Sequence, residues 1–412
     1  MNLGTGDGTN GAGAATGAPH RPTARTWLVP HLASLGTTIF AEMSALALAT
    51  GSINLGQGFP DTDGPRAIAE AAARAVLDGR GNQYPPGPGI PELRLAIATH
   101  QLDRYGIELD PDTQVLVTAG ATEAIAAAML ALVDQGDEGV ALEPYYDSYA
   151  ATIAMARGVR VPVTLRPPDF ALDVAALRAA ITPRTKVILL NSPHNPTGAV
   201  LSAADLRAIA AIAVAHDLVV VSDEVYEHLV FDGGEHVPIC TLPGMADRTV
   251  TIGSAGKTFS FTGWKVGWVT GSAELVTAVR TTKQFLTYVS AGPFQYAVAE
   301  ALGSPPQVYD ELRDDLQAKR DLLCEGLEGL GLRVYRPSGT YFVTTDVRPL
   351  GWDDGTAFCR ELPARCGVVA IPHQVFYDDI EAGRPLVRWA FCKRPEVLRE
   401  AVRRLSDGRL AR

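Results

Sequence analysis

Cysteine is scarce in this chain, and the few cysteines are not arranged for metal binding or for a disulfide framework. The sequence of 412 residues contains five of them. None forms a C-x-x-C pair or lies at the Cys/His spacing that is typical of a zinc site. We therefore expect reduced, mostly structural thiols in a cytoplasmic protein, and no metal site. The cysteines are Cys240, Cys324, Cys359, Cys366 and Cys392.

Long apolar runs and an excess of positive charge are also missing. No stretch approaches the roughly 20 apolar residues that span a bilayer, and the N-terminus lacks a charged-then-apolar signal pattern. The chain has 36 basic against 46 acidic residues, a formal net charge of −10 at pH 7, and its basic residues are scattered. These features predict neither a membrane protein nor a nucleic-acid-binding protein.

The sequence does contain enough apolar material for a large core. Hydrophobic residues make up 47% of the chain, which predicts one large α/β unit and a smaller one. Residues 1–34 begin rich in Gly, Ala and Thr with few large apolar residues, and we expect a disordered tail there. We expect residues 35–70 and 305–412 to form the smaller α+β domain, and residues 71–304 the larger domain.

Short β-branched runs alternate with Ala- and Leu-rich stretches between residues 112 and 247. TQVLVTAG precedes ATEAIAAAMLALV, and KVILLNSP precedes a helical stretch that is followed by LVVVSDEV. This order predicts right-handed βαβ crossovers and a mainly parallel central sheet flanked by helices, in an α/β fold. Such sheets bind ligands at the carboxyl ends of their strands. We expect the site there, between the two domains.

Lys257 follows one of these strand ends, in the stretch TVTIGSAGKTFSFTGWKVGW at residues 249–268. A lysine that forms a Schiff base must lose its proton, and burial or a nearby cation lowers a lysine pKa. A lysine near a turn is usually solvated, but here small and apolar residues surround it on both sides. We therefore interpret Lys257 as a Schiff-base lysine, with Ser254 and Lys265 beside it.

Asp223 ends the apolar run LVVV and precedes Tyr226. A carboxylate at the end of a central strand can pair with a pyridine nitrogen and keep it protonated, which makes the ring an electron sink. Tyr226 can hydrogen-bond a hydroxyl on the same ring. The alternative is that Asp223 caps a following helix. A Schiff-base lysine and this carboxylate are together the pair that pyridoxal 5′-phosphate (PLP) requires.

Two further strand ends carry groups that suit the rest of this cofactor. In NSPHNPTG (191–198), Asn195 can hydrogen-bond a phenolic oxygen and a carboxylate, although the string alone is only a turn signal. We interpret His194 there as structural, because no nucleophile or metal partner is visible. In AGATEA (119–124), N–H groups at a helix start favour a phosphate, or else form a plain strand-to-helix turn. These N–H groups belong to Gly120, Ala121 and Thr122.

Tyr146, Tyr84 and Arg388 complete the candidates that the residues themselves suggest. Tyr146 in EPYYDSY can lay its ring on a cofactor, although a core position is the commoner role of such a residue. Tyr84 lies in the proline-rich NQYPPGPG and either reaches a second subunit or is a surface tyrosine. Arg388 interrupts the apolar strand LVRWAF, and its planar guanidinium can bind a carboxylate through two hydrogen bonds. An outward-facing arginine is the alternative.

In this order the motifs resemble those of the class I and II aminotransferases, PLP enzymes of fold type I, from about Thr37 to Leu405. The strings NLGQGFPD, DEVYEHLVFD and VRWAFCKR strengthen the resemblance. It implies that Lys257 carries PLP and moves the proton, that Asp223 holds the ring nitrogen, and that the phenolic oxygen has two ligands, Asn195 and Tyr226. The implied phosphate ligands are Ser254, Lys265, Gly120, Ala121, Thr122 and, from the partner subunit of a homodimer, Tyr84.

The resemblance also implies how a substrate is held. Tyr146 would stack on the cofactor ring, and the substrate would be an amino acid or a 2-oxo acid. The implied ligands of the substrate α-carboxylate are Arg388, Asn195 and the backbone of Gly58. Phe40 and Tyr288 would lie near the side-chain pocket.

Two subgroups of the family are most similar. GSAGKTFSFTGWKVGW resembles the kynurenine/glutamine aminotransferases that also act as cysteine-S-conjugate β-lyases, whereas NQYPPGPG, SPHNPTGAVLS, DEVYEHLVFD and FCKR resemble actinobacterial N-succinyldiaminopimelate aminotransferases. We expect an amino group to pass from an L-amino acid to a 2-oxo acid such as 2-oxoglutarate. N-succinyl-LL-diaminopimelate is the first substrate expected, and a glutamine- or kynurenine-type donor the second.

Some features leave other outcomes open. The kynurenine-type enzymes have an aromatic residue where this chain has Thr122, and the segment YDDIEAGRP is shorter here, so an aromatic-substrate preference is unsupported. β-Elimination or oxidation by oxygen would use the same residues. A PLP-sensing regulator would need a DNA-binding domain, for which the Gly/Ala-rich tail is too small.

Overall fold

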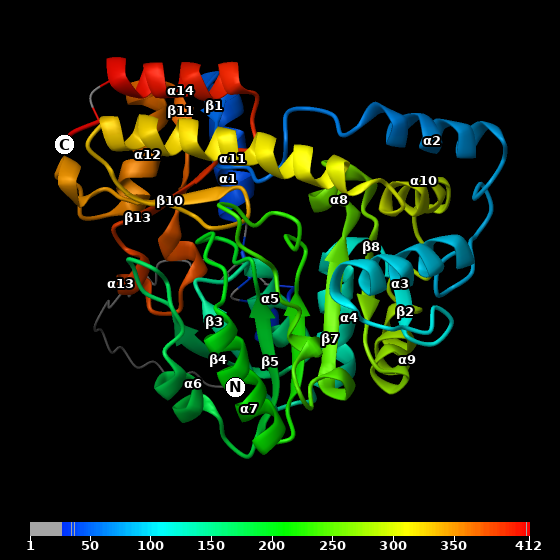
Figure 1. The fold of residues 1–412 in the computed structure, drawn as a ribbon. Coiled ribbons are helices and arrows are strands. Elements are labelled where there is room, and N and C mark those ends of the chain that lie inside the picture. The colour runs from blue at the N-terminus through cyan, green and yellow to red at the C-terminus, as the bar shows by residue number, and fades with distance from the viewer. Residues whose placement is uncertain (1–26, 34, 37, 409) are drawn as a thin grey trace, which may run out of the picture.

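The computed structural model describes residues 27–33, 35–36, 38–408 and 410–412. Apart from residues 27–33, the tail expected to be disordered lies outside the described residues. The described part has a large lobe, built on a seven-stranded sheet, and a smaller lobe beside it (Figure 1). Among the described residues, no helix is both long and apolar enough to cross a membrane.

The large sheet is mainly parallel, as expected. Its third to seventh strands pair in parallel, and only β8 runs antiparallel to both of its neighbours. In spatial order the strands are β2 (Val115–Thr118), β8 (Gly267–Thr270), β7 (Thr249–Ser254), β6 (Val219–Asp223), β5 (Thr185–Asn191), β3 (Glu138–Glu143) and β4 (Val159–Thr164).

Helices connect these strands and cover the sheet (Figure 1). Local sequence defines some helix ends directly: the helix of residues 203–215 begins with a capping box between Ser202 and Asp205. The helices of the large lobe are α2 (Arg66–Leu77), α3 (Pro91–Tyr105), α4 (Gly120–Leu132), α5 (Asp147–Met155), α6 (Val174–Ala180), α7 (Ala203–Ala215), α8 (Ala255–Thr258), α9 (Ala273–Lys283) and α10 (Gly292–Leu302).

Apolar side chains project from both faces of the large sheet, because successive residues of a strand point to opposite faces and both faces are buried. In β5, Val187 and Leu189 join the core that contains α4, α5 and α9. Ile188 and Leu190 point the other way, into the core that contains α6 and α7. A third cluster packs α2, α3 and α10 against the β2 end of the sheet. Because both faces of the sheet are filled by apolar side chains, the polar groups of a site can lie only at the strand ends.

The smaller lobe joins the two ends of the chain in an α+β unit, as expected. β1 (Ile53–Asn54) pairs in parallel with β11 (Val368–Val369), and a separate sheet is antiparallel. In order, its strands are β12 (Ile371–Pro372), β13 (Leu386–Ala390), β10 (Phe342–Asp346) and β9 (Arg333–Tyr335). The helices are α1 (Ile39–Thr50), α11 (Pro306–Gly329), α12 (Gly355–Cys366), α13 (Ile380–Gly383) and α14 (Pro395–Asp407).

Helix α11 contacts both lobes along its length (Figure 1). Near its start, Tyr309 belongs to the α2–α3–α10 core of the large lobe. Near its end, Leu323 and Leu327 are buried in the core that continues into the smaller lobe. Short 3₁₀ helices complete the described chain: η1 (Pro30–Leu32), η2 (Ile239–Thr241), η3 (Ala246–Arg248), η4 (Thr262–Trp264), η5 (Arg348–Leu350) and η6 (His373–Phe376).

Candidate active site

A cavity of about 340 Å³ lies between the two lobes, at the carboxyl ends of β5, β6 and β7. All of the predicted site residues line it except Tyr84 and Tyr288. The predicted residues that the cavity brings together are Phe40, Gly58, Gly120, Ala121, Thr122, Tyr146, Asn195, Asp223, Tyr226, Ser254, Lys257, Lys265 and Arg388.

Lys257 stands in α8, directly after β7, and its amine reaches into the cavity. The amine Nζ donates to the hydroxyl of Tyr341 at 2.8 Å. The pKa of Lys257 is lowered to about 8, chiefly by burial; Cys392 and Asp223 oppose the shift, and Lys265 and Arg388 add to it. Burial is thus a larger cause than the Lys265 charge that the sequence suggested. A large share of the amine is neutral near pH 8, as a Schiff-base lysine requires.

Asp223 is the last residue of β6 and is almost fully buried. Its Oδ2 accepts a hydrogen bond of 2.6 Å from the hydroxyl of Tyr149. Burial raises the pKa of Asp223 to about 6, against the hydrogen bond from Tyr149, which lowers it. The residues after Asp223 form a turn and not a helix, so Asp223 is not a helix cap. Its Oδ1 accepts only a long hydrogen bond, of 3.4 Å, from the Val225 N–H. A buried carboxylate that lines the cavity fits a protonated ring nitrogen.

Gly120, at the start of α4, makes room for Lys265. Its φ is +75°, and a Cβ there would lie 3.1 Å from the Lys265 Nζ. The lysine amine therefore occupies the space that any larger residue at position 120 would fill. The N-terminus of α4, the Lys265 amine and Ser254 at the end of β7 all face the cavity. Helix N–H groups and an ammonium group together fit a phosphate.

Arg388 lies in the middle of β13 with 1% of its surface exposed, so the outward-facing alternative is wrong. Its Nη1 donates to Oδ1 of Asn195 at 3.0 Å, and its Nη2 donates to the carbonyl of Gly56 at 2.8 Å. The buried Nε has no hydrogen-bond partner among the described residues. Burial lowers the pKa of Arg388 to about 10. Arg388 lines the cavity, and a buried guanidinium that donates to an amide oxygen and a carbonyl fits a carboxylate ligand.

Aromatic residues enclose the polar groups of the cavity. The ring of Phe342 lies 4.0 Å from the Arg388 guanidinium carbon, and that of Phe40 lies 5.1 Å away. Tyr146 precedes α5, and Tyr226 is buried beside Asp223. Burial raises the pKa of both tyrosines. Cation–π contacts of this kind stabilise a buried guanidinium that lacks a full set of anionic partners.

The sequence did not identify three residues that organise the site. Asn191, at the end of β5, accepts from the Asn195 N–H at 2.7 Å and donates to the Asp223 carbonyl at 2.8 Å. Its pairing register with Asp223 follows from the strand ends, so the parallel-sheet rule could have found it. Tyr149 lies in the first turn of α5, three residues after the predicted Tyr146, and so also carried a local signal. Tyr341 had none.

Tyr84 and Tyr288 lie away from the cavity of their own chain. Their exposed fractions are 82% and 52%, and their rings meet edge to face with centroids 5.7 Å apart. Phe285, three residues before Tyr288 in the sequence, is 83% exposed. The single chain therefore leaves an aromatic patch, Tyr84, Phe285 and Tyr288, in solvent.

Two groups of residues bear on the expected lack of a metal site. The five cysteines are unpaired thiols. Among the described residues, His100, Glu227 and His228 bring potential ligand atoms within 4.8 Å of one another. The histidine Nε2 atoms are 3.0 Å apart, and burial together with the charge of Arg104 lowers the pKa of both rings. A nearby guanidinium disfavours a dication, so this group is better described as a buried hydrogen-bonding pair beside a carboxyl.

This fold and this arrangement of lysine, aspartate and arginine define an aminotransferase of fold type I. The family model described as aminotransferase class I and II matches residues 50–405, and the chain belongs to this family. Enzymes of the family depend on PLP.

Individual relatives match nearly the whole chain. A protein from Mycobacterium tuberculosis named a probable N-succinyldiaminopimelate aminotransferase is 54% identical over 92% of this chain and 98% of its own length. The methionine aminotransferase of Escherichia coli is 41% identical, with 92% and 98% covered. The solved structure of N-succinyldiaminopimelate aminotransferase from M. tuberculosis has a TM-score of 0.91 at 55% identity, covering 93% of this chain and 100% of that one.

Proposed function

We propose that this chain binds PLP in the cavity between the lobes and uses it to exchange an amino group between N-succinyl-LL-diaminopimelate and 2-oxoglutarate. The observation that carries the proposal is that the Lys257 amine, the Asp223 carboxylate and the Arg388 guanidinium all line one cavity. They supply the Schiff-base amine, the partner of the ring nitrogen and the anchor for a carboxylate. Bound PLP supplies an electron sink for the bond broken at the substrate Cα.

The residues of the large lobe fit the cofactor at both of its ends. Asp223 holds the ring nitrogen protonated, and a cation there favours the ionised carboxylate at neutral pH. Tyr149 orients Asp223 through the bond to Oδ2, and the Val225 N–H donates to Oδ1 at 3.4 Å. At the phosphate end, the space kept open by Gly120 lets the Lys265 amine meet the anion together with the N-terminus of α4.

Lys257 and Arg388 act on the substrate. Arg388, which lines the cavity, binds the α-carboxylate beside Asn195. This contact orients the Cα–H bond toward the amine of Lys257, which takes the proton from Cα and returns it. The lowered pKa of Lys257, about 8, keeps the amine basic yet partly unprotonated at neutral pH. The aromatic wall of Phe40 and Phe342 excludes water from the carboxylate pocket.

Similarity supports the choice of substrate. The M. tuberculosis relatives that are named for N-succinyldiaminopimelate match 92% and 93% of this chain. A glutamine- or kynurenine-type donor, suggested by the motifs, is the second candidate. The E. coli relative is named for methionine, which adds methionine as a further candidate. β-Elimination from a donor with a leaving group on Cβ would use the same residues.

We further propose a homodimer in the cytoplasm. The aromatic patch of Tyr84, Phe285 and Tyr288 is exposed in a single chain, as expected of a surface that a second subunit covers. In that arrangement Tyr84 completes the phosphate site of the partner. The cytoplasmic location rests on the reduced cysteines, none of which is paired.

Spectroscopy and turnover test the proposal together. We expect purified protein incubated with PLP to show a visible absorbance band, shifted to longer wavelength than that of free PLP, that Lys257→Ala lacks. A panel containing N-succinyl-LL-diaminopimelate, methionine, glutamine and kynurenine should bleach this band with the first compound at the lowest concentration. Turnover of another donor alone would replace the substrate. No turnover of any donor with bound PLP would reject transamination.

A further inference from the structure

We infer that Tyr341 is a positioning residue for the Lys257 amine, holding it at a fixed place on the cavity wall whenever it is free to move a proton. The inference deepens the proposed function and rests on it for the identity of the reaction. The hydroxyl of Tyr341 is 2.8 Å from the Lys257 Nζ. Its own proton goes to the carbonyl of Gly58, at 2.6 Å. The oxygen of Tyr341 must therefore accept from the amine.

The Tyr341 ring has little freedom to move. The residue is 1% exposed. The ring meets Tyr226 edge to face with centroids 5.2 Å apart, and it meets Phe342 at 4.8 Å. On the far side, Gly58 can carry no Cβ, because one would lie 2.4 Å from the Phe342 ring. The hydroxyl is thus fixed between an amine of the large lobe and a carbonyl of the smaller lobe.

The loop before Tyr341 is fastened to the two segments that carry the cofactor ligands. The Thr340 N–H donates to the Leu229 carbonyl at 2.9 Å, and the Gly339 N–H donates to the Gly198 carbonyl at 2.9 Å. A Cβ on Gly198 would lie 2.2 Å from the Pro337 Cβ. The loop therefore touches both NSPHNPTG and the turn that follows SDEVYEH. A displacement of either segment would be transmitted to Tyr341.

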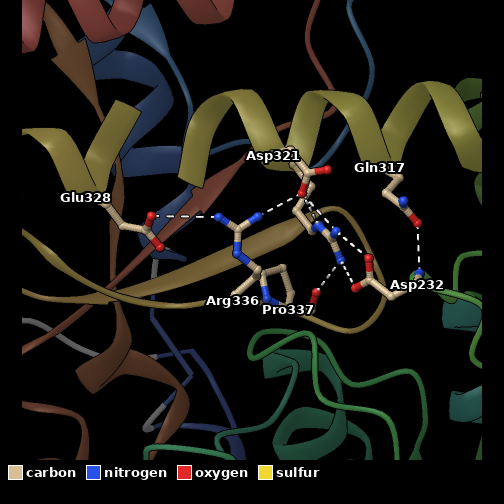
Figure 2. A network of polar contacts seen from close by, with 7 residues as sticks. Asp232, Gln317, Asp321, Glu328, Arg336 and Pro337 are labelled. Atoms are coloured by element: carbon tan, nitrogen blue, oxygen red, sulfur yellow. Dashed lines mark hydrogen bonds and ion pairs between the residues drawn. The ribbon is translucent and has the colours of Figure 1, made fainter. Parts of the chain in front are cut away.

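Charged residues hold the same loop from outside (Figure 2). The guanidinium of Arg320, on α11, pairs with Asp232 and donates to the Pro337 carbonyl at 3.1 Å. Asp321, the next residue on α11, accepts from Arg336 at 2.8 Å. Figure 2 shows Asp232, Asp321, Arg336 and Pro337 meeting along one side of the helix. Helix α11, the turn at Asp232 and the loop before Tyr341 are thus one connected unit.

Placing the amine matters because several charges act on it. A fixed acceptor stabilises the ammonium form and limits the rotamers of a long side chain. Without Tyr341 the amine would be able to turn toward Asp223 or away from the cavity. The charged and titratable groups that act on the Lys257 amine are Asp223, Lys265, Arg388 and Cys392.

Tyr341→Phe removes the acceptor and keeps the ring. In protein without cofactor, we expect the pH midpoint of Lys257 acetylation by pulsed acetic anhydride, followed by peptide mass spectrometry, to fall by about one unit. In the PLP-loaded enzyme, we expect kcat to fall roughly tenfold with the donor KM changed less than about twofold. Loss of positioning acts on proton transfer and leaves the carboxylate contact with Arg388 in place.

Tyr309→Phe is the matched control, since it also removes a buried tyrosine hydroxyl, one that donates to the Leu302 carbonyl at 3.0 Å. Tyr309 is not among the residues that line the cavity. The substitution should leave the Lys257 midpoint and kcat unchanged. If Tyr341→Phe acetylates with the wild-type midpoint, the inference is overturned, whatever the activity. If the midpoint moves while wild-type protein fails to transaminate, the positioning stands and the proposed function falls. A shifted midpoint with reduced kcat supports both.

Discussion

At the scale of single residues, burial shifts the pKa values of the two main groups of the site in opposite directions. It raises the pKa of Asp223 to about 6 and lowers that of Lys257 to about 8, so each group moves toward its neutral form. A protein without cofactor therefore holds its two central charges at a cost in stability, and a cationic ring beside Asp223 offsets part of it. The arrangement of the site thus lowers the stability of the cofactor-free protein in favour of ligand binding.

This cost predicts that Asp223→Asn stabilises the cofactor-free protein, and at which pH it does so. An aspartate carboxyl ordinarily has a pKa of 3.8, whereas the pKa of Asp223 in the folded protein is about 6, so its contribution is fully favourable below about pH 4 and is lost as pH rises through 6. We expect cofactor-free Asp223→Asn to be more stable than wild type at pH 7 by up to about 3 kcal/mol, and no more stable at pH 4. PLP affinity should fall at least about tenfold.

Urea unfolding at pH 4, 5, 6 and 7, with absorbance titration of PLP, measures both quantities. Asp217→Asn, at an exposed carboxylate that pairs with Arg248 on the surface, is the control and should show neither change. A wild-type protein that matched Asp223→Asn in stability at every pH would contradict the assignment of a strained, buried carboxyl.

Arg388 makes a second prediction at this scale. Arg388→Lys keeps a charge but loses the planar fork and the Nε donor that has no protein partner among the described residues. We expect kcat/KM to fall at least about 100-fold. The factor should be similar for N-succinyl-LL-diaminopimelate and for methionine, because the α-carboxylate is common to both. PLP absorbance should be retained. Arg384→Lys, at a half-exposed arginine paired with Glu381, should change neither; a donor-dependent loss would place Arg388 at the side-chain pocket instead.

At the scale of elements, the site depends on two loops whose backbones pack closely at a glycine. The strands bring Asn191, Asp223 and Ser254 to one edge of the sheet. The loop between β9 and β10 then closes over that edge, and Gly198 lies where the two meet. Glycine is required here for two separate reasons, a φ of +74° and the missing Cβ. The first is a matter of backbone strain and the second of packing.

A pair of glycine substitutions separates these reasons. Gly233 has a φ of +73° but open space around a Cβ, whereas a Cβ on Gly198 would lie 2.2 Å from Pro337. We expect Gly233→Ala to cost about 1 kcal/mol through strain alone, and Gly198→Ala to cost about 2 kcal/mol more through overpacking. Denaturant unfolding measures the difference, and kcat should fall only in Gly198→Ala. Equal costs would show that the loop moves freely away from NSPHNPTG.

At the scale of the whole molecule, the predictable part of the site is the part that local sequence encodes. Asp223 and Lys257 could be placed because each follows a buried apolar strand, and parallel strands end at one edge. The contacts of Tyr149 with Asp223 and of Tyr341 with Lys257 join residues 74 and 84 positions apart. They depend on how a helix rotates on the sheet and how one lobe docks on the other. No periodicity or motif encodes those packing angles, and burial as the main cause of the Lys257 pKa shift depends on them too.

The proposed homodimer is the last feature at this scale, and it predicts that Tyr84 serves the partner's site. Tyr84 is 82% exposed and does not line the cavity of its own chain. We expect Lys257→Ala to be inactive and Tyr84→Ala to lose at least about tenfold in kcat/KM, through weaker phosphate binding.

A mixed dimer of the two variants, prepared by co-expression with two affinity tags, tells which chain supplies Tyr84. In that dimer one site combines the intact Lys257 of one subunit with the intact Tyr84 of the other, so activity should recover to roughly half that of the wild-type dimer. If Tyr84 acted within its own chain, both sites of the mixed dimer would be defective and no recovery would occur. Size-exclusion chromatography with light scattering establishes that the measured species is a dimer, because a monomer with full activity would remove the need for a partner altogether.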